Sequence, residues 1–276
     1  MTRIYSATFQ IPPTQADALG DYYIGRGALS STSSQVDSDT TELTILATRK
    51  SWFKSVGIST DPTEVRPSDW KYTSHNDRPT VTLIPGVTIV AEGTSTNTLT
   101  GIQIILDPKD AFGDGHHPTT QLCASYLREL TTRAPITSLL DVGCGTGVLS
   151  ILAHHLNIPT IHAIDIETQS VRKTKKNARL NHCNLTVKQG DVLTWSPTIQ
   201  YDIVIANLLT TVIEQSFSRL ITWVTPNGFI ILSGISTRWR PTILTLIQDH
   251  GYQAEVSQKD DWCGFLITRT TGRKFP

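Results

Sequence analysis

The sequence predicts an α/β fold with a mostly parallel sheet that ends in an antiparallel hairpin, preceded by a small α+β domain. From about residue 138 onward, near-continuous apolar runs alternate with amphipathic segments of helical period. This alternation is typical of parallel strands that helices cover on both faces. The last two strand patterns are joined by the turn-like segment 259–261, which predicts an antiparallel hairpin at the edge of the sheet.

The strand and helix patterns of this region follow one another along the chain. The predicted strands span 139–142, 161–165, 185–189, 201–206 and 229–233. The predicted helices span 121–130, 148–156, 167–180, 210–224 and 239–250, and the hairpin strands span 253–258 and 265–270. Basic residues gather in the helix over 167–180, which indicates a solvated face, with a partner-binding patch as the alternative.

The first hundred residues lack this rhythm and predict a separate domain. Strand patterns occur over 3–11 and 43–48, a short helix pattern occurs over 14–22, and the segment 29–42, rich in Ser, Thr and Asp, predicts a loop. We therefore expect a small α+β domain over residues 1–65. Residues 66–100 contain two weak strand patterns and predict a connecting segment, which leaves residues 101–276 for the α/β domain.

The balance of charges limits the classes of partner. Lys and Arg together number 24, as do Asp and Glu, so the formal net charge is zero. Proteins that bind nucleic acid mainly through its phosphates are normally basic, so no direct nucleic-acid partner is expected. The N-terminus lacks the apolar run of a signal peptide, no stretch is long enough to span a bilayer, and the four cysteines are scattered. We expect a cytoplasmic protein with reduced cysteines and no membrane partner.

A glycine-rich turn is the most informative segment of the chain. An apolar strand pattern ends in Asp141, and the chain then turns through Gly143, Gly145 and Gly147 into a helix pattern. Glycine permits positive φ and lets the backbone approach a ligand closely, and a helix N-terminus offers free N–H groups to an anion. The dinucleotide fingerprint requires a third glycine at the position of Val148, so a nicotinamide dehydrogenase is disfavoured. The alternative is a turn that binds nothing.

The order acid-x-G-x-G-x-G is similar to the first motif of S-adenosylmethionine-dependent methyltransferases. Asp141, Gly143 and Gly145 are therefore candidate cofactor-binding residues. Asp165 closes the next strand pattern, where a doubly wound fold presents a carboxylate to a ribose hydroxyl. Because dinucleotide-binding proteins share this second feature, Asp165 supports nucleoside binding without identifying the nucleoside.

A second motif precedes the glycine turn. Residues 112–120 are F-G-D-G-H-H-P-T-T, and by themselves they indicate a loop and a helix start, because Pro118 suits the first turn of a helix. The run resembles the F-G-x-G-x-H-P-T-T signature of the PrmA family, the methyltransferases of the eleventh protein of the large ribosomal subunit. Matches over 204–209, 232–235 and 262–263 extend the resemblance to about residues 100–270.

This resemblance implies a class I methyltransferase core, which is a Rossmann-like, seven-stranded sheet, with S-adenosylmethionine as cofactor. It implies that Thr120 contacts the methionine end of the cofactor, that Gly143 lies against it, and that Asp165 binds the ribose hydroxyls. Asn207 would lie beside the reacting methyl group and the incoming amine, as the catalytic and a cofactor-binding residue, because an amide accepts a hydrogen bond without carrying charge. Asp191 stands where related enzymes bind the adenine amino group, and a surface-loop acid is the equal alternative.

The implied reaction is in-line transfer of a methyl group to a lysine or N-terminal amine of the ribosomal protein. Such a transfer needs orientation, desolvation and a neutral amine, and no side chain of the motifs is an obvious general base. The family's N-terminal domain resembles a ferredoxin-like fold and recognises the substrate, but Ser74 here replaces an expected tryptophan and Asp114 an expected threonine. The alternatives are another protein, an RNA or a small molecule as acceptor, or a non-catalytic S-adenosylmethionine-binding protein.

A metal site is not expected. Asp114, His116 and His117 offer the right atoms, but adjacent side chains rarely bind one ion and no matched carboxylate follows them. A loop over the cofactor is the preferred interpretation of this segment.

Overall fold

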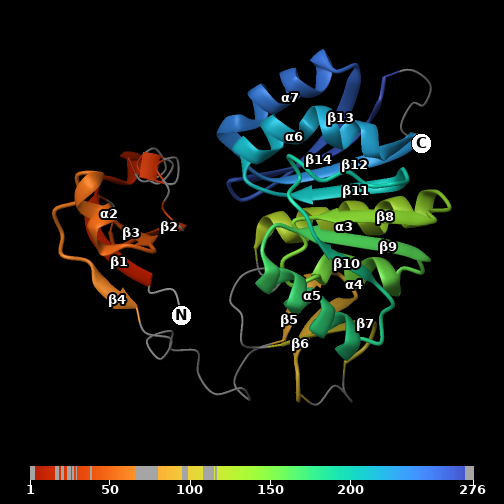
Figure 1. Cartoon of the computed structure of the whole chain (residues 1–276), viewed down its shortest axis with the longest axis horizontal. Coiled ribbons are helices and arrows are strands. Elements are labelled where there is room, and N and C mark those ends of the chain that lie inside the picture. Colours follow the sequence, from red (N-terminus) through yellow and green to blue (C-terminus); the bar gives the residue numbers. More distant parts are fainter. Residues whose placement is uncertain are drawn as a thin grey trace. The chain divides into compact units, whose positions relative to one another are not determined.

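The computed structural model describes residues 4–15, 19, 22–23, 26, 28, 30–37, 39–65, 80–94, 99–107, 115 and 117–270. The chain divides into two compact units, Met1–Thr73 and Ser74–Pro276 (Figure 1). In the described residues, no helix is long and apolar enough to cross a membrane.

The first unit is built on a four-stranded antiparallel sheet. Its strands are β1 (Ile4–Ile11), β2 (Ser30–Gln35), β3 (Thr41–Ala47) and β4 (Thr63–Val65), in the order β2-β3-β1-β4. The short helices are η1 (Pro13–Gln15) and α2 (Lys50–Ser55). Alternate residues of β3 are buried, and they form a core with Phe53 of α2, as expected for a sheet with one covered face.

The strand β2 corrects one sequence-based expectation. The segment 29–42 was expected to be a loop, yet Ser30–Gln35 pairs with β3 along its length. The segment is rich in Ser and Thr, so it lacks the alternating apolar residues that predict a strand. The strand forms because its backbone groups hydrogen-bond to those of β3, and this pairing does not depend on the side chains. The helix expected over 14–22 falls mostly outside the described residues.

The second unit contains a seven-stranded sheet in the order β10-β9-β8-β11-β12-β14-β13. The strands are β8 (Ser138–Val142), β9 (Thr160–Asp165), β10 (Thr186–Gln189), β11 (Tyr201–Asn207), β12 (Val224–Ser236), β13 (Tyr252–Lys259) and β14 (Trp262–Arg269). The first five of these in the sheet order are parallel, and β14 runs antiparallel to both of its neighbours. The predicted fold class, with its closing hairpin, is confirmed.

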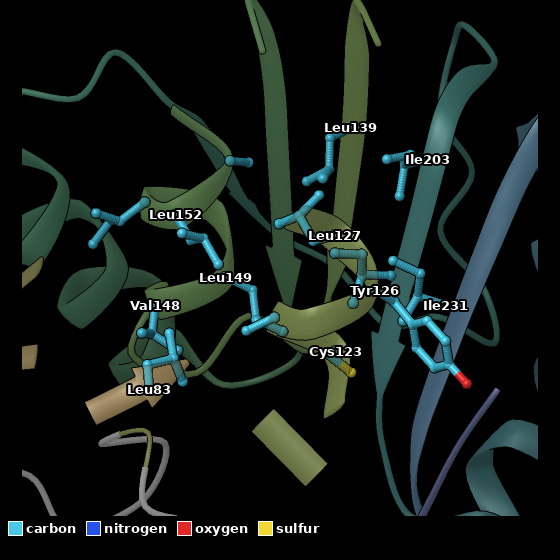
Figure 2. Close-up of a cluster of buried hydrophobic side chains, with 14 of the residues drawn as sticks. Leu83, Cys123, Tyr126, Leu127, Leu139, Val148, Leu149, Leu152, Ile203 and Ile231 are labelled. Carbon is cyan, nitrogen blue, oxygen red and sulfur yellow. The ribbon is translucent and has the colours of Figure 1, made fainter. Parts of the chain in front are cut away.

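Helices cover both faces of this sheet. They are α3 (Pro118–Arg133), α4 (Val148–His155), α5 (Thr168–Leu180), α6 (Thr210–Trp223) and α7 (Arg240–Asp249), with the short η2 (Thr237–Trp239) before α7. Consecutive strand residues point to opposite faces, so Leu139 packs with α3 and α4 while Leu140 packs with α6 and α7. Figure 1 shows α6 and α7 on one side of the sheet and α4 and α5 on the other. In Figure 2, Leu139 and Ile203 point from the sheet toward Leu127 of α3.

A smaller sheet extends the α3–α4 side of the second unit. It consists of β5 (Val81–Ile84), β6 (Val87–Ala91) and β7 (Ile102–Leu106). Its apolar residues, such as Val87 and Ile104, join the core formed by α3, α4 and the large sheet. Within the segment 66–100 that was expected to connect the domains, β5 pairs with β6, and β6 pairs with β7. All three strands belong to the second unit, Ser74–Pro276.

Candidate active site

The candidate site lies where the direction of the strand order reverses. From β8 the chain proceeds outward through β9 and β10 and then returns to the other side of β8 with β11 and β12. Ligands of open α/β sheets bind outside the carboxyl ends of the strands at such a point. The strand register places Val142 beside Ile164 and Ala206. The residues that follow these three, namely Gly143, Asp165 and Asn207, therefore share one edge.

The glycine turn joins β8 to α4 in left-handed backbone conformations. Gly143, Gly145 and Gly147 have φ values of 74°, 54° and 81°, which side chains disfavour. The Gly143 amide donates to the Ile164 carbonyl of β9 at 2.8 Å. A Cβ added at Gly145 would meet no heavy atom within 4 Å, so the turn leaves open space there that a ligand can approach.

Asp165 ties this turn to the end of β9. One carboxylate oxygen accepts from the Gly145 amide and the other from the Glu167 amide, each at 2.9 Å. The residue is 8% exposed. Each carboxylate oxygen has a further lone pair, so Asp165 can hold the turn and still accept hydrogen bonds from vicinal hydroxyls. These two features fit the ribose of a nucleoside cofactor.

Asp141 is oriented toward α4. Its carboxylate is 2% exposed and accepts a hydrogen bond from the Ser150 hydroxyl at 2.6 Å. Burial, with the nearby Asp165 as a smaller contribution, raises the pKa of Asp141 to about 6, against the lowering effect of the Ser150 hydrogen bond. The hydrogen bond to Ser150 connects the end of β8 to α4. A direct contact between Asp141 and the cofactor stays a prediction.

Asp141 makes part of the stability of the fold depend on pH. The unfolded carboxyl ionises near 3.8, whereas the pKa of folded Asp141 is about 6. Between these values the folded state binds the additional proton, so the free energy of unfolding falls as the pH rises from about 4 to about 6 and stays lower above it. We expect this component to be about 2–3 kcal/mol. It should vanish in Asp141→Asn, as measured by urea unfolding at acidic and neutral pH.

Asp202 provides a control of opposite sign. Hydrogen bonds from Thr137 and Ser138 hold the pKa of Asp202 below its ordinary value, although burial opposes them. Its contribution is present at neutral pH and is lost as the pH falls through the folded pKa, so Asp202→Asn should lose more stability at neutral than at acidic pH. Parallel pH profiles for Asp141→Asn and the unchanged protein would contradict the role assigned to Asp141.

Asp191 follows β10 and lies beside the end of β9. The Gly190 amide donates to the Asp165 carbonyl at 2.9 Å, which brings Asp191 to the same edge as the glycine turn. One oxygen of the Asp191 carboxylate accepts from the Leu193 amide at 2.9 Å. This local turn accounts for the acid, and the adenine contact stays a prediction.

Asn207 ends β11 at the site, directly opposite Ser233 of β12. Its side chain is half-buried. Across the part of the chain that the structure describes, no hydrogen bond engages the Asn207 amide group, which therefore remains available to an incoming ligand. The contact of Asn207 with the acceptor amine stays a prediction.

Thr120 is placed by the first turn of α3. His117 caps this helix, since its Nδ1 accepts from the Thr119 amide at 3.4 Å and contacts the Thr119 hydroxyl at 2.7 Å. Thr120 itself is 4% exposed. The His117 ring also packs against Trp262, with ring centroids 4.8 Å apart. Phe112, Gly113, Asp114 and His116 lie outside the described residues, so the rest of the motif and its expected loop stay predictions.

Sequence reasoning missed several residues that support the turn from α5. The Thr174 hydroxyl donates to the Gly145 carbonyl at 2.9 Å, and the Asn177 amide group donates to the Thr146 carbonyl at 2.8 Å. Asn177 also accepts from the Asp107 amide at 3.0 Å, which links the start of the 107–120 segment to the turn. These residues could have been found in the sequence, because they are polar residues on the apolar face of the amphipathic helix α5.

Comparisons with known proteins agree with this arrangement. The family model described as ribosomal protein L11 methyltransferase (PrmA) matches residues 25–270. The ribosomal protein L11 methyltransferase of Burkholderia vietnamiensis is 30% identical over 256 residues, covering 81% of this chain and 84% of the relative. That of Burkholderia thailandensis is 29% identical over 293 residues, covering 94% and 96%.

A solved structure extends the agreement to three dimensions. The crystal structure of the ribosomal protein L11 methylase of Lactobacillus delbrueckii subsp. bulgaricus aligns with a TM-score of 0.63 and 28% identity, covering 69% of this chain and 98% of that one. The resemblance seen in the motifs is thus confirmed over most of the sequence. The chain belongs to the ribosomal protein L11 methyltransferase (PrmA) family.

Proposed function

We propose that this protein transfers methyl groups from S-adenosylmethionine to lysine or N-terminal amines of ribosomal protein L11. Family membership supports the reaction and the substrate. Within the structure, the observation that carries the proposal is the row of Gly143, Asp165 and Asn207 at the switch point. This row supports a site for a ribose-bearing cofactor beside an uncharged amide that can bind an amine.

The residues of the site hold and orient the reactants. When bound, the cofactor supplies an activated methyl group on sulfur. Asp165 accepts hydrogen bonds from the ribose hydroxyls, the Gly145 side of the turn admits the cofactor, and Thr120 faces its methionine end. Asn207 accepts a hydrogen bond from the amine and so directs the nitrogen lone pair along the line of transfer. This orientation of the amine by an uncharged side chain lowers the barrier to methyl transfer.

In this proposal the two units have different functions. The unit from Ser74 to Pro276 contains the methyl-transfer site, and the unit Met1–Thr73, with its one-sided sheet, recognises the ribosomal protein. A ribosomal protein substrate implies action in the cytoplasm. The balanced charge of the chain supports a protein acceptor over a nucleic acid.

Methylation of L11 from cells that lack this gene tests the proposal. The purified protein with S-adenosylmethionine should add whole methyl units to L11, as measured by intact-protein and peptide mass spectrometry. We expect Asn207→Ala to lower kcat by at least about 100-fold, because the amine loses its orienting group. Asn227, exposed at the other end of β12, is a matched control, and Asn227→Ala should retain activity. Methyl groups on RNA, or on other proteins but not L11, would overturn the substrate assignment.

A further inference from the structure

The loop after Asn207 lies close to two glycines, one in the turn after β8 and one in β12. A Cβ added at Gly143, in the turn after β8, would overlap Cδ2 of Leu208. A Cβ added at Gly234, in β12, would overlap the carbonyl oxygen of Leu208 and would lie 2.8 Å from its carbonyl carbon and 3.0 Å from its nitrogen. Leu208 therefore occupies space that exists only because both positions lack side chains.

Leu208 is held by its main chain and its side chain at once. Its amide donates to the Ser233 carbonyl at 3.2 Å. Its side chain is half-buried and packs against the core cluster beneath α6 and α7. In the described residues, by contrast, the amide group of Asn207 makes no hydrogen bond of its own, so its position depends on the backbone that Leu208 fixes.

We propose that Leu208 is a positioning residue that sets the place of the Asn207 amide relative to the glycine turn. The inference rests on the proposed function, in which the turn binds the cofactor and Asn207 binds the amine. Because the same side chain contacts the turn and continues the backbone of Asn207, it sets the separation between methyl donor and acceptor. Methyl transfer is sensitive to that separation, since a misplacement of about 1 Å can cost about 100-fold in rate.

Truncation and conservative replacement of Leu208 separate positioning from packing. Leu208→Ala should lower kcat by about 10- to 100-fold, while the Kd for S-adenosylhomocysteine, measured by calorimetry, changes by less than about threefold, since none of the predicted cofactor contacts is removed. Leu208→Met keeps the side-chain volume and should recover most of kcat. Leu244→Ala is the matched control, because Leu244 of α7 is half-buried against the same core cluster; it should lose stability with kcat unchanged.

A double-mutant cycle with Gly143 tests the contact itself. In the presence of Leu208, Gly143→Ala introduces both a steric overlap and a strained backbone, whereas in Leu208→Ala only the backbone strain remains. The fold-loss of kcat caused by Gly143→Ala should therefore be at least about fivefold smaller in the Leu208→Ala background, because contacting residues are not additive.

The outcomes distinguish this inference from the proposed function. Absence of methyl transfer by the unchanged protein to L11 overturns the proposed function. An active protein in which Leu208→Ala and Leu244→Ala have equal effects on kcat overturns the positioning role. A double-mutant cycle in which the fold-losses of kcat caused by the Gly143 and Leu208 substitutions simply multiply also overturns the positioning role. The same holds if Leu208→Met lowers kcat as much as Leu208→Ala does.

Discussion

Gly234→Ala is expected to reduce methyl transfer by at least about 100-fold, because the Leu208 and Asn207 backbone must move to admit a Cβ. The added atom would overlap the Leu208 carbonyl oxygen and lie 2.8 Å from the carbonyl carbon. Main-chain atoms cannot rotate out of the way as the end of a side chain can. Gly234 also has a φ of 84°, so alanine there adds backbone strain of about 1–2 kcal/mol to an overpacking cost of about 1–3 kcal/mol.

Gly251 offers the control for this prediction. Its φ is 77°, close to that of Gly234, yet an added Cβ would meet nothing within 4 Å. Gly251→Ala should therefore show the backbone strain alone, as a loss of about 1–2 kcal/mol in urea unfolding with kcat unchanged. If the two variants lost stability and activity to the same extent, close approach of Gly234 to Leu208 would not explain the result.

Asp165→Ala should weaken the binding of S-adenosylhomocysteine by at least about 100-fold, because hydrogen bonds to a carboxylate contribute about 1.5–3 kcal/mol each. The substitution removes the proposed acceptor of the ribose hydroxyls. It also leaves the amides of Gly145 and Glu167 without their partner, which loosens the turn that approaches the ligand. Isothermal calorimetry measures the affinity, and a thermal unfolding curve shows whether the variant is folded.

Asp191 is the matched acid at the same edge of the sheet. Its carboxylate accepts from the nearby Leu193 amide, so we expect Asp191→Ala to weaken cofactor binding by less than about tenfold, as for loss of one hydrogen bond. A loss as large as that of Asp165→Ala would favour the adenine contact over the local turn. Retained affinity in Asp165→Ala would contradict the role of Asp165 in cofactor binding.

The parts of the fold that sequence reasoning predicted have local signals. Strands β8, β9 and β11 are rich in apolar residues, and the glycines of the turn adopt the positive φ values that their spacing indicates. The family assignment rested on motifs of the same kind and was confirmed by the match over residues 25–270. The roles of Thr120, Asp191 and Asn207 toward ligands stay predictions.

The parts that were missed depend on partners distant in the sequence. Strand β2 has a polar sequence and is defined by pairing with β3. The strands β5 and β6 lie in the segment where two weak strand patterns were expected, but the sequence did not show that their apolar residues join the core with α3 and α4. Neither signal is visible within a short window of residues, because burial is a property of the packed chain.

The sequence by itself determined the glycine turn, the alternation of strands and helices, and the family. These features depend on the spacing of glycines and on the periodicity of apolar residues, and both can be recognised within a short segment of the sequence. Only the tertiary structure decided that Asp141 is buried against Ser150, and that Leu208 lies against Gly143 and Gly234. Such contacts join residues from separate strands and helices, so they exist only once the sheet has brought these segments together and close packing leaves each atom one place to lie.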